Sequence, residues 1–393
     1  MRYGRGAAPT FPVERDAKRA ALLAAVESVR APLEANRDEA ELLRTLPTAS
    51  VEAMRDAGLF GLKLPTELGG AEADPIVQMD VIEAITRIDP AAGWCMFITG
   101  AVAGSASARL PDEAIDQIFA TGRFPSFVGT LKPNGTATRV DGGYRITGRW
   151  SWGSGLGHAD WVSVLSFADD PKTVVSACVP ISDVTVHDTW HVMGMKGTGS
   201  ADYSLEDVFV PDVFVTDTAR PVQQRGGPLY RLGMPGFVVN EHAIFPLALA
   251  GRMLDDLITL AIEKKRGYGS GTTTADRAIV QRLVSESTLR LRACRLLADD
   301  VLGRLLAAAT DGPPHPALQA EARAAAVRCT DEAIEIATAA FRHAGGSAVY
   351  LDHMMQRCLR DLMVIQSHFV VDDSAYEQHG ALLLGVSDKA SMS

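Results

Sequence analysis

The sequence of 393 residues lacks paired cysteines, an excess of basic residues and any apolar run long enough to cross a membrane. The net charge of −10 disfavours nucleic acid as a partner, because binding to a phosphate backbone needs a basic face. No CxxC pair and no histidine at ligand spacing accompanies the cysteines, so neither a metal site nor a disulfide framework is predicted. We expect all five to be reduced core residues: Cys95, Cys178, Cys294, Cys329 and Cys358.

Signals for export and for nucleotide binding are also missing. Residues 1–12 carry two arginines with no apolar stretch behind them, unlike a secretory signal, so we expect a cytoplasmic protein. No GxGxxG motif follows a strand pattern and no GxxxxGK[ST] occurs, which excludes a recognisable nicotinamide site or P-loop. Gly194, Gly197 and Gly199 lie within strand-like sequence and are interpreted as turn residues.

What is present changes character twice along the chain. Residues 13–120 have apolar positions at helical spacing, and residues 121–225 gain Gly, Thr and Val with the alternation of strands. Helical periodicity returns over 232–393. This order predicts a mainly α protein with a central β domain: an N-terminal helical domain, an antiparallel sheet or small barrel, and a C-terminal helical bundle.

Three groups of segments, in this order, resemble the acyl-CoA dehydrogenase family over nearly the whole chain. They are DAGLFGLKLP at 56–65 with DPAAGW at 89–94, DGGYRITG at 141–148 with WSWGSG at 150–155 and HADW at 158–161, and AGGS at 344–347 with Arg360-Asp361. The resemblance implies that family's fold, in which a helical domain, an antiparallel β-barrel and a four-helix bundle follow one another.

The resemblance also implies a flavin site in the β domain. Family members flank the isoalloxazine ring with a tryptophan and a hydroxyl residue, which here are Trp152 and Ser154. An indole suits the apolar face of the ring and a hydroxyl suits its polar edge. Two positions apart on a predicted strand, both side chains should point the same way. Trp150 shares that face and is expected to pack in the core; the alternative for the pair is a core tryptophan and a turn serine.

Further cofactor contacts follow from the same resemblance. Lys265 and Arg266 match the segment that reaches the flavin pyrophosphate of a neighbouring subunit, and either is a candidate for the contact. Gly345 and Gly346 would let backbone N–H groups approach a phosphate, and Thr130 would add a pocket hydroxyl. The plain alternatives are a helix-end charge, a helix terminator and a structural strand residue.

The residues after Arg360-Asp361 decide between two reactions. Most dehydrogenases of the family place a glutamate base about eight residues later, where this chain has Phe369, which cannot take a proton. The adjacent His368, in Ser367-His368-Phe369, resembles the flavin-dependent monooxygenase branch, whose histidine lies near the flavin C4a position. There reduced flavin and oxygen form a C4a-hydroperoxide, to which an imidazole donates a hydrogen bond or a proton. A structural helix histidine is the alternative.

We therefore interpret the chain as the oxygenase component of a two-component flavin-dependent monooxygenase. The branch implies FMNH2 or FADH2 from a separate NAD(P)H:flavin reductase and a homo-oligomer, by the family pattern a tetramer, with no metal. The small apolar side chains of 101–107 favour a bulky aromatic or polyketide-like substrate. Two alternatives stay open: an acyl-CoA dehydrogenase with Glu241 as its base, although Glu241 also suits a helix start, and a catalytically silent flavin-binding scaffold.

Overall fold

The computed structural model describes residues 11–170, 172–263 and 272–389. Contacts divide the chain into two compact units, each described here by itself. The β unit comprises residues up to Ala73 together with Ala91–Val192 and Lys196–Tyr230. The helical unit comprises Asp74–Pro90, the short segment Met193–Met195, and the chain from Arg231 onward.

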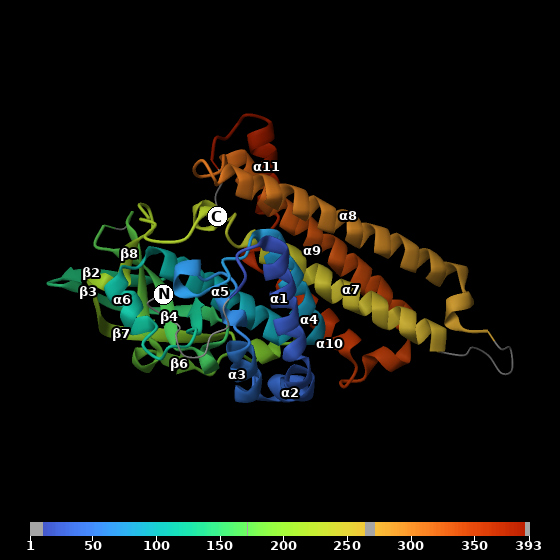
Figure 1. Ribbon diagram of the computed structural model, residues 1–393. Helices are drawn as coiled ribbons and strands as arrows, with labels where there is room; N and C mark the ends of the chain where they lie inside the picture. The colour runs from blue at the N-terminus through green and yellow to red at the C-terminus, as the bar shows by residue number, and fades with distance from the viewer. Residues whose placement is uncertain (1–10, 171, 264–271, 390–393) are drawn as a thin grey trace. The chain divides into compact units, whose positions relative to one another are not determined.

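The β unit begins with helices and continues into a sheet (Figure 1). Its helices are α1 (Arg15–Ser28), α2 (Arg30–Leu43), α3 (Thr48–Asp56), α5 (Pro90–Arg109) and α6 (Asp112–Ile118). Among the described helices, α5 alone has the length and hydropathy of a membrane span, and 72% of that stretch is buried within the fold. Such burial is typical of the core helix of a globular unit.

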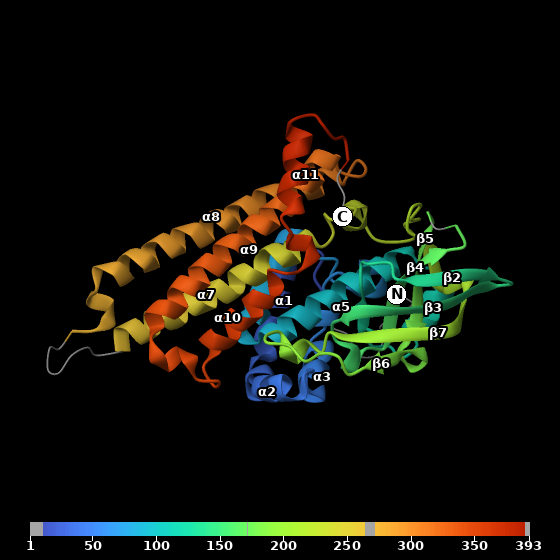
Figure 2. The same ribbon diagram turned by 180° about the vertical axis from the view of Figure 1, so that it is seen from behind.

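The sheet of the β unit is mixed (Figure 2). Its strands are β1 (Phe127–Gly129), β2 (Gly135–Val140), β3 (Gly143–Gly153), β4 (Trp161–Ala168), β5 (Val174–Pro180), β6 (Thr185–His187), β7 (Ala201–Pro211) and β8 (Val215–Asp217). They lie in the order β6-β7-β3-β2-β4-β5-β8, with β1 beside β4.

The predicted mainly α class with a central sheet is confirmed, but the expectation of a wholly antiparallel sheet is wrong in two pairings. β4 runs parallel to β2 and to β1, whereas the other pairings are antiparallel. The tight turn at Gly142 reverses the chain into β3, and the connection to β4 reverses it again. Two reversals restore the original direction, so β4 joins the far edge of β2 in parallel.

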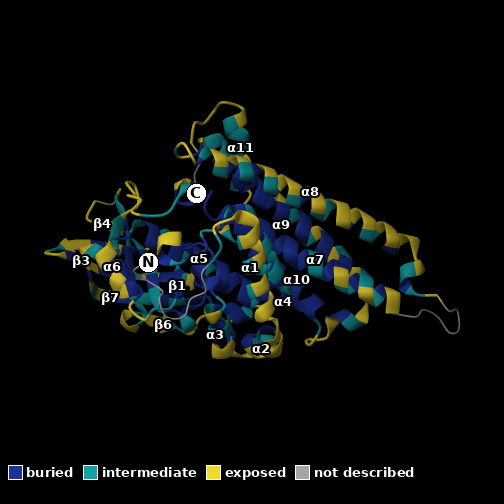
Figure 3. Cartoon of the chain, viewed as in Figure 1, coloured by how far each residue is buried: buried dark blue, intermediate teal, exposed yellow. Residues whose placement is uncertain are grey.

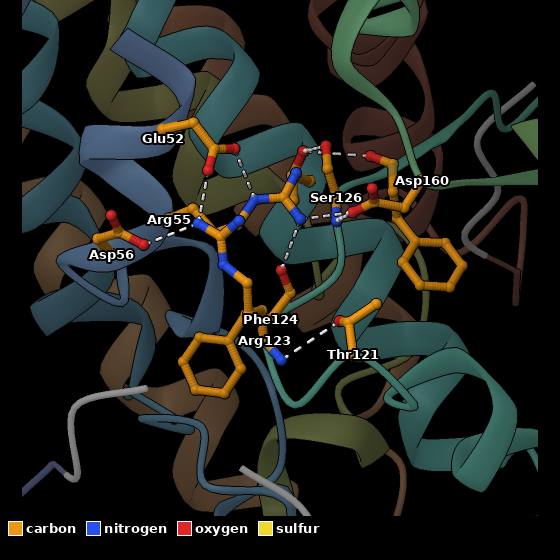
Figure 4. A network of polar contacts seen from close by, with 10 residues as sticks. Glu52, Arg55, Asp56, Thr121, Arg123, Phe124, Ser126 and Asp160 are labelled. Atoms are coloured by element: carbon orange, nitrogen blue, oxygen red, sulfur yellow. Dashed lines mark hydrogen bonds and ion pairs between the residues drawn. The ribbon is translucent and has the colours of Figure 1, made fainter. Parts of the chain in front are cut away.

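An ion-pair network fixes the start of β4 (Figure 4). Asp160 Oδ2 accepts hydrogen bonds from Arg55 Nη1 at 2.7 Å and from the backbone N of Ser126 at 2.7 Å. Arg55 lies on α3, and its side chain is only 10% exposed. Nearby, Arg123 donates to Glu52 at 2.6 Å and to Asp56, both also on α3. Helix α3 is thereby tied to the strands by charge pairs that are partly shielded from water.

The helical unit is a bundle whose long members lie side by side in both views (Figures 1 and 2). Its helices are α4 (Pro75–Ile88), α7 (Val239–Glu263), α8 (Ala278–Ala308), α9 (Pro316–Ala344), α10 (Met354–Ile365) and α11 (Ser374–Leu383). The interior is built mainly from small and aliphatic side chains, and α8 exposes its outer face (Figure 3). This arrangement agrees with the predicted C-terminal helical bundle.

Helix α4 belongs to this bundle although its sequence lies in the first predicted domain. Asn240 on α7 donates to Gln78 on α4 at 2.8 Å, and both side chains are buried. The change from helix to strand near residue 120 and back to helix at Val239 lies close to the predicted boundaries. The division into 13–120, 121–225 and 232–393 stays a prediction, because packing groups α4 with the C-terminal helices.

The Asp160 network yields a stability prediction. Asp160→Ala removes the acceptor of the buried Ser126 N–H and the 2.7 Å ion pair of Arg55, which keeps its weaker contacts to Phe124 and Glu52, so the free energy of unfolding should fall by about 2 kcal/mol in urea denaturation. The control is Asp212→Ala, which breaks an ion pair with Arg139 whose two side chains are about half exposed. That change should cost less than about 1 kcal/mol. Equal losses in the two variants would contradict the anchoring role of Asp160.

Candidate functional site

The end of β3 sends Trp152 and Ser154 in different directions. Trp152 has a left-handed backbone (φ 65°), and the pairing of β3 with β7 shifts register between Trp150 and Gly153. The strand ends at Gly153. Trp152 is 64% exposed, whereas Ser154 is 6% exposed. The expectation that both point the same way is therefore wrong, because it assumed a regular strand through both residues.

Trp150 behaves as the sequence predicts. It is 1% exposed and stacks on Tyr203 with ring centroids 5.8 Å apart, and its Nε1 donates to the Leu165 backbone oxygen at 2.8 Å. It is a packing residue of the β unit. Trp152 differs in presenting an exposed indole, which is the surface a flat aromatic ligand needs.

Ser154 lies in a buried polar chain. Trp94 Nε1 donates to Ser154 Oγ at 2.8 Å, and Ser154 Oγ lies 2.7 Å from Ser200 Oγ. Ser200 Oγ in turn lies 2.7 Å from Thr198 Oγ1. Trp94 lies in the motif DPAAGW at 89–94, but the sequence predicts no partner for it and singles out neither Ser200 nor Thr198. No local signal links α5 to the turn before β7, so only the tertiary structure joins them.

Thr130 lies directly after β1 and is half-buried. Its Oγ1 donates to the Lys132 backbone oxygen at 3.4 Å, a local contact typical of a turn. Its role as a pocket hydroxyl stays a prediction.

His158, between Ser154 and β4, is a second feature that sequence reasoning missed. Neither ring nitrogen has a hydrogen-bond partner among the described residues, and both are shielded from solvent. Burial, with the nearby Arg55 cation, lowers the pKa of His158 to about 4. A Cβ atom at Gly155 (φ 88°) would lie 2.9 Å from His158 Nε2, so the turn after Ser154 needs glycine for both its backbone angle and its closeness to the ring.

His368 occupies a defined turn in the helical unit. It follows α10 and caps a short 3₁₀ helix, where its Nδ1 accepts a hydrogen bond from the Val370 backbone N at 3.3 Å. The buried Arg323 of α9 holds the same turn by donating to the backbone oxygens of Phe369 at 2.7 Å and Val370 at 3.0 Å. The histidine is therefore held by its neighbours and does not lie within a helix.

A second imidazole pairs with His368. The ring centroids of His242 and His368 are 4.5 Å apart, and His242 Nδ1 lies 3.0 Å from the Val238 carbonyl oxygen. A carbonyl only accepts, so His242 carries its proton on Nδ1. His368 Nδ1 accepts from Val370, so the neutral His368 carries its proton on Nε2. The backbone thus sets both tautomers.

The same surroundings keep His368 neutral. Burial, with the adjacent His242, holds the pKa of His368 well below its ordinary value. At neutral pH its Nε2–H is therefore a hydrogen-bond donor without positive charge. Of the two roles predicted for this histidine, donating a hydrogen bond fits these surroundings better than acting as an imidazolium acid.

Arg360-Asp361 has a structural task that the motif alone did not reveal. Asp361 accepts a hydrogen bond from the Met195 backbone N, and Arg360 Nη1 donates to the Met193 oxygen at 2.6 Å. Between them, a Cβ at Gly194 would lie 2.2 Å from the Arg360 oxygen. The pair clamps the 193–195 segment onto α10, and glycine is required there because the two backbones approach so closely.

The remaining predicted residues divide into three groups. Gly345 ends α9 with φ 78°, a helix-terminating role that needs glycine, and Gly346 opens the next turn, where an added Cβ atom would meet nothing within 4 Å. Glu241 is fully buried in the first turn of α7, so it is not an exposed helix-start residue. Lys265 and Arg266 lie outside the described residues. The cofactor and catalytic roles of all these residues stay predictions.

Comparison with known proteins identifies the chain. The N-terminal domain of acyl-CoA dehydrogenase matches residues 14–119, and the C-terminal domain of acyl-CoA dehydrogenase matches residues 241–373. The chain belongs to the acyl-CoA dehydrogenase family. Within the family it is 30% identical over 349 residues to a pigment production hydroxylase of Rhodococcus sp. (strain ATCC 21145), covering 85% of this chain and 89% of the relative.

Other family members support the same branch. An indole-3-acetate monooxygenase of Pseudomonas putida is 28% identical, covering 93% of this chain and 95% of the relative. The solved structure of the 3-HSA hydroxylase from Rhodococcus sp. RHA1 is 25% identical with a TM-score of 0.87, covering 95% of this chain and 99% of that one. These matches confirm the predicted family, its fold and its flavin-dependent monooxygenase branch.

The shielded ring nitrogens of His158 predict a pH dependence of stability. Its pKa is about 4 in the folded chain against an ordinary 6.5, so the unfolded chain binds the proton more readily between these values. The contribution of neutral His158 to the free energy of unfolding is fully present above pH 6.5. As the pH falls below 6.5, the free energy of unfolding decreases by about 1.4 kcal/mol per pH unit, down to about pH 4.

The measurement is the free energy of unfolding against pH for the native chain and for His158→Gln. The difference between the two should change with this slope below pH 6.5 and be flat above it. Exposed His191→Gln is the control for the substitution itself. Parallel curves for the native chain and His158→Gln would show that His158 is not the group that resists protonation.

Proposed function

We propose that this chain is the oxygenase component of a two-component flavin-dependent monooxygenase, which uses reduced flavin and O2 to oxygenate a bulky aromatic or polyketide-like small molecule. The observation that carries the proposal is the turn after α10. By the family resemblance Phe369 stands where a dehydrogenase base would be, and beside it His368 is a half-buried, neutral donor whose tautomer is set by the backbone.

The relatives support this activity by their names. Besides the hydroxylase and the monooxygenase above, the chain is 28% identical over 358 residues to the flavin-dependent monooxygenase, oxygenase subunit HsaA, of Rhodococcus jostii (strain RHA1). Over 183 residues, which cover 44% of this chain and 43% of the relative, it is 31% identical to the FADH(2)-dependent resorcinol hydroxylase, oxygenase component, of Rhizobium sp. (strain MTP-10005). The name oxygenase component implies that a separate reductase supplies the reduced flavin. We propose that this chain also receives its reduced flavin from a separate NAD(P)H:flavin reductase.

Reduced flavin is the cofactor, as FADH2 or FMNH2. Reduced flavin supplies the electrons that activate O2. The exposed Trp152 would meet the apolar face of the ring and Ser154 its polar edge. Thr130, directly after β1 of the same sheet, would add a pocket hydroxyl. For the phosphates we propose Lys265 or Arg266 and the backbone at Gly345 and Gly346. The exposed indole and the buried serine hydroxyl both fit a flat ring with acceptors along one edge.

We propose a homo-oligomer, by the family pattern a tetramer, in the cytoplasm. The supporting argument for the substrate is the α5 sequence from Ala101 to Ser107, where small side chains leave room for a bulky apolar molecule.

Glu241 keeps the dehydrogenase as a second candidate. It is fully buried at the start of α7, immediately before His242, and a buried carboxylate is the kind of group that serves as a base. A dehydrogenase would reduce its flavin directly with an acyl-CoA, whereas an oxygenase needs a reductase. The silent scaffold would do neither, so catalysis distinguishes all three.

The decisive experiment combines the chain with NADH, a flavin reductase, FMN or FAD and candidate aromatic substrates. We expect a product that contains one atom from ¹⁸O-labelled O2. In His368→Asn the product per flavin oxidised should fall on the order of a hundredfold, with hydrogen peroxide released instead, because the shorter asparagine amide cannot place its donor where the imidazole Nε2–H lies. Flavin binding and the melting temperature should be retained.

Glu241→Gln is the matched comparison, because it removes a buried acid from the same unit. Under the oxygenase proposal it should leave the coupling of flavin oxidation to product largely intact. Under the dehydrogenase alternative it should abolish reduction of the flavin by an acyl-CoA, since an amide cannot accept the proton. Unchanged coupling in His368→Asn would remove His368 from the reaction.

A further inference from the structure

A row of buried hydroxyl groups in the β unit leads to Ser154. We call Ser154, Ser200 and Thr198 the hydroxyl chain; successive oxygens lie 2.7 Å apart. The three residues and Trp94 are each no more than 6% exposed. Hydroxyl groups this close and this shielded are hydrogen-bonded to one another, so the direction of one bond constrains the next.

The Trp94 indole fixes the first bond. An indole N–H can only donate, so Trp94 occupies one lone pair of Ser154 Oγ. A serine hydroxyl has one proton and two lone pairs. The contacts with Trp94 and Ser200 use two of these three positions, which leaves one for a ligand. Whether that position donates or accepts depends on the direction of the bond between Ser154 and Ser200.

The hydroxyl chain allows both directions. When Thr198 donates to Ser200 and Ser200 donates to Ser154, the proton of Ser154 is directed to the ligand. When Ser154 donates to Ser200 and Ser200 donates to Thr198, Ser154 offers the ligand a lone pair. Both arrangements keep the same bonds between the three hydroxyls, so a ligand can select between them by the partner that it presents to Ser154.

We propose that Ser200 and Thr198 are positioning residues, which let Ser154 accept from the N5–H of reduced flavin and donate to the bare N5 of oxidised flavin. Only the reduced ring carries a hydrogen on N5, so the two redox states present opposite partners to one hydroxyl. The inference rests on the proposed function, in which Ser154 meets the flavin edge. Without an acceptor inside the protein, the hydroxyl hydrogen of Ser154 would face the N5–H of the reduced ring, and two donors cannot form a hydrogen bond.

The test is anaerobic titration of the full chain with FMN and with FAD, each in the reduced and the oxidised state. Ser200→Ala removes the internal acceptor for the Ser154 proton, and Thr198→Val removes the acceptor for Ser200. In both variants the Kd for reduced flavin should rise about five- to tenfold, roughly the effect of one hydrogen bond, while the Kd for oxidised flavin changes less than about twofold.

Two controls separate this role from general packing. Thr198→Ser keeps the hydroxyl and should keep the native ratio of the two Kd values. Ser176→Ala breaks the Ser163–Ser176 hydroxyl pair (3.0 Å) between β4 and β5, away from the hydroxyl chain, and should also leave the ratio unchanged. Ser200→Ala and Thr198→Val change the hydroxyl chain at different residues. If Ser200→Ala does not fold, the comparison of the Kd ratio in Thr198→Val with that in Thr198→Ser tests the proposal by itself.

Other outcomes overturn the inference or the proposed function separately. An unchanged ratio in Ser200→Ala and Thr198→Val, or equal weakening of both redox states, would show that the hydroxyl chain is only structural. A native chain that prefers oxidised flavin and makes no oxygenated product would refute the proposed function. In that case a shift of the ratio in the two variants would still support the role of the hydroxyl chain.

Discussion

The left-handed backbone of Trp152 is the constraint on which the candidate flavin site depends. The pairing of β3 with β7 shifts register there, and the indole is exposed whereas the serine two residues later is buried against Trp94. A regular strand would have placed both side chains on one face. A non-glycine residue in this conformation is costly and occurs where function or packing holds it in place.

Burial sets the protonation of the candidate groups in both units. In the helical unit two imidazoles lie against each other, and backbone atoms at Val238 and Val370 determine which nitrogen of each ring carries the proton. In the β unit, His158 is kept neutral, and the hydroxyls of Ser154, Ser200 and Thr198 form a row of hydrogen bonds. These imidazole and hydroxyl groups therefore act by donating and accepting hydrogen bonds and carry no charge.

Much of the fold was predictable because it depends on periodicity and on local turn residues. The helical spacing before residue 120 and after 232, and the alternation between them, correctly predict the elements. The parallel pairing of β4 with β2 was not predictable, since a chain pattern does not record which edge a returning strand joins. Helix α4 also packs with distant helices through Gln78 and Asn240, a contact between residues 162 positions apart.

The sequence by itself determined the family, the order of elements and the missing dehydrogenase base, because motif residues and the absence of an acid at Phe369 are local facts. Tertiary structure alone decided what surrounds each candidate. It placed His368 beside His242, where His368 is a neutral donor. Arg360 and Asp361 form hydrogen bonds with the 193–195 segment, and Ser154 forms them with Trp94 and Ser200. These contacts link residues far apart along the chain, and burial, which fixes their protonation and direction, arises only when the chain is packed.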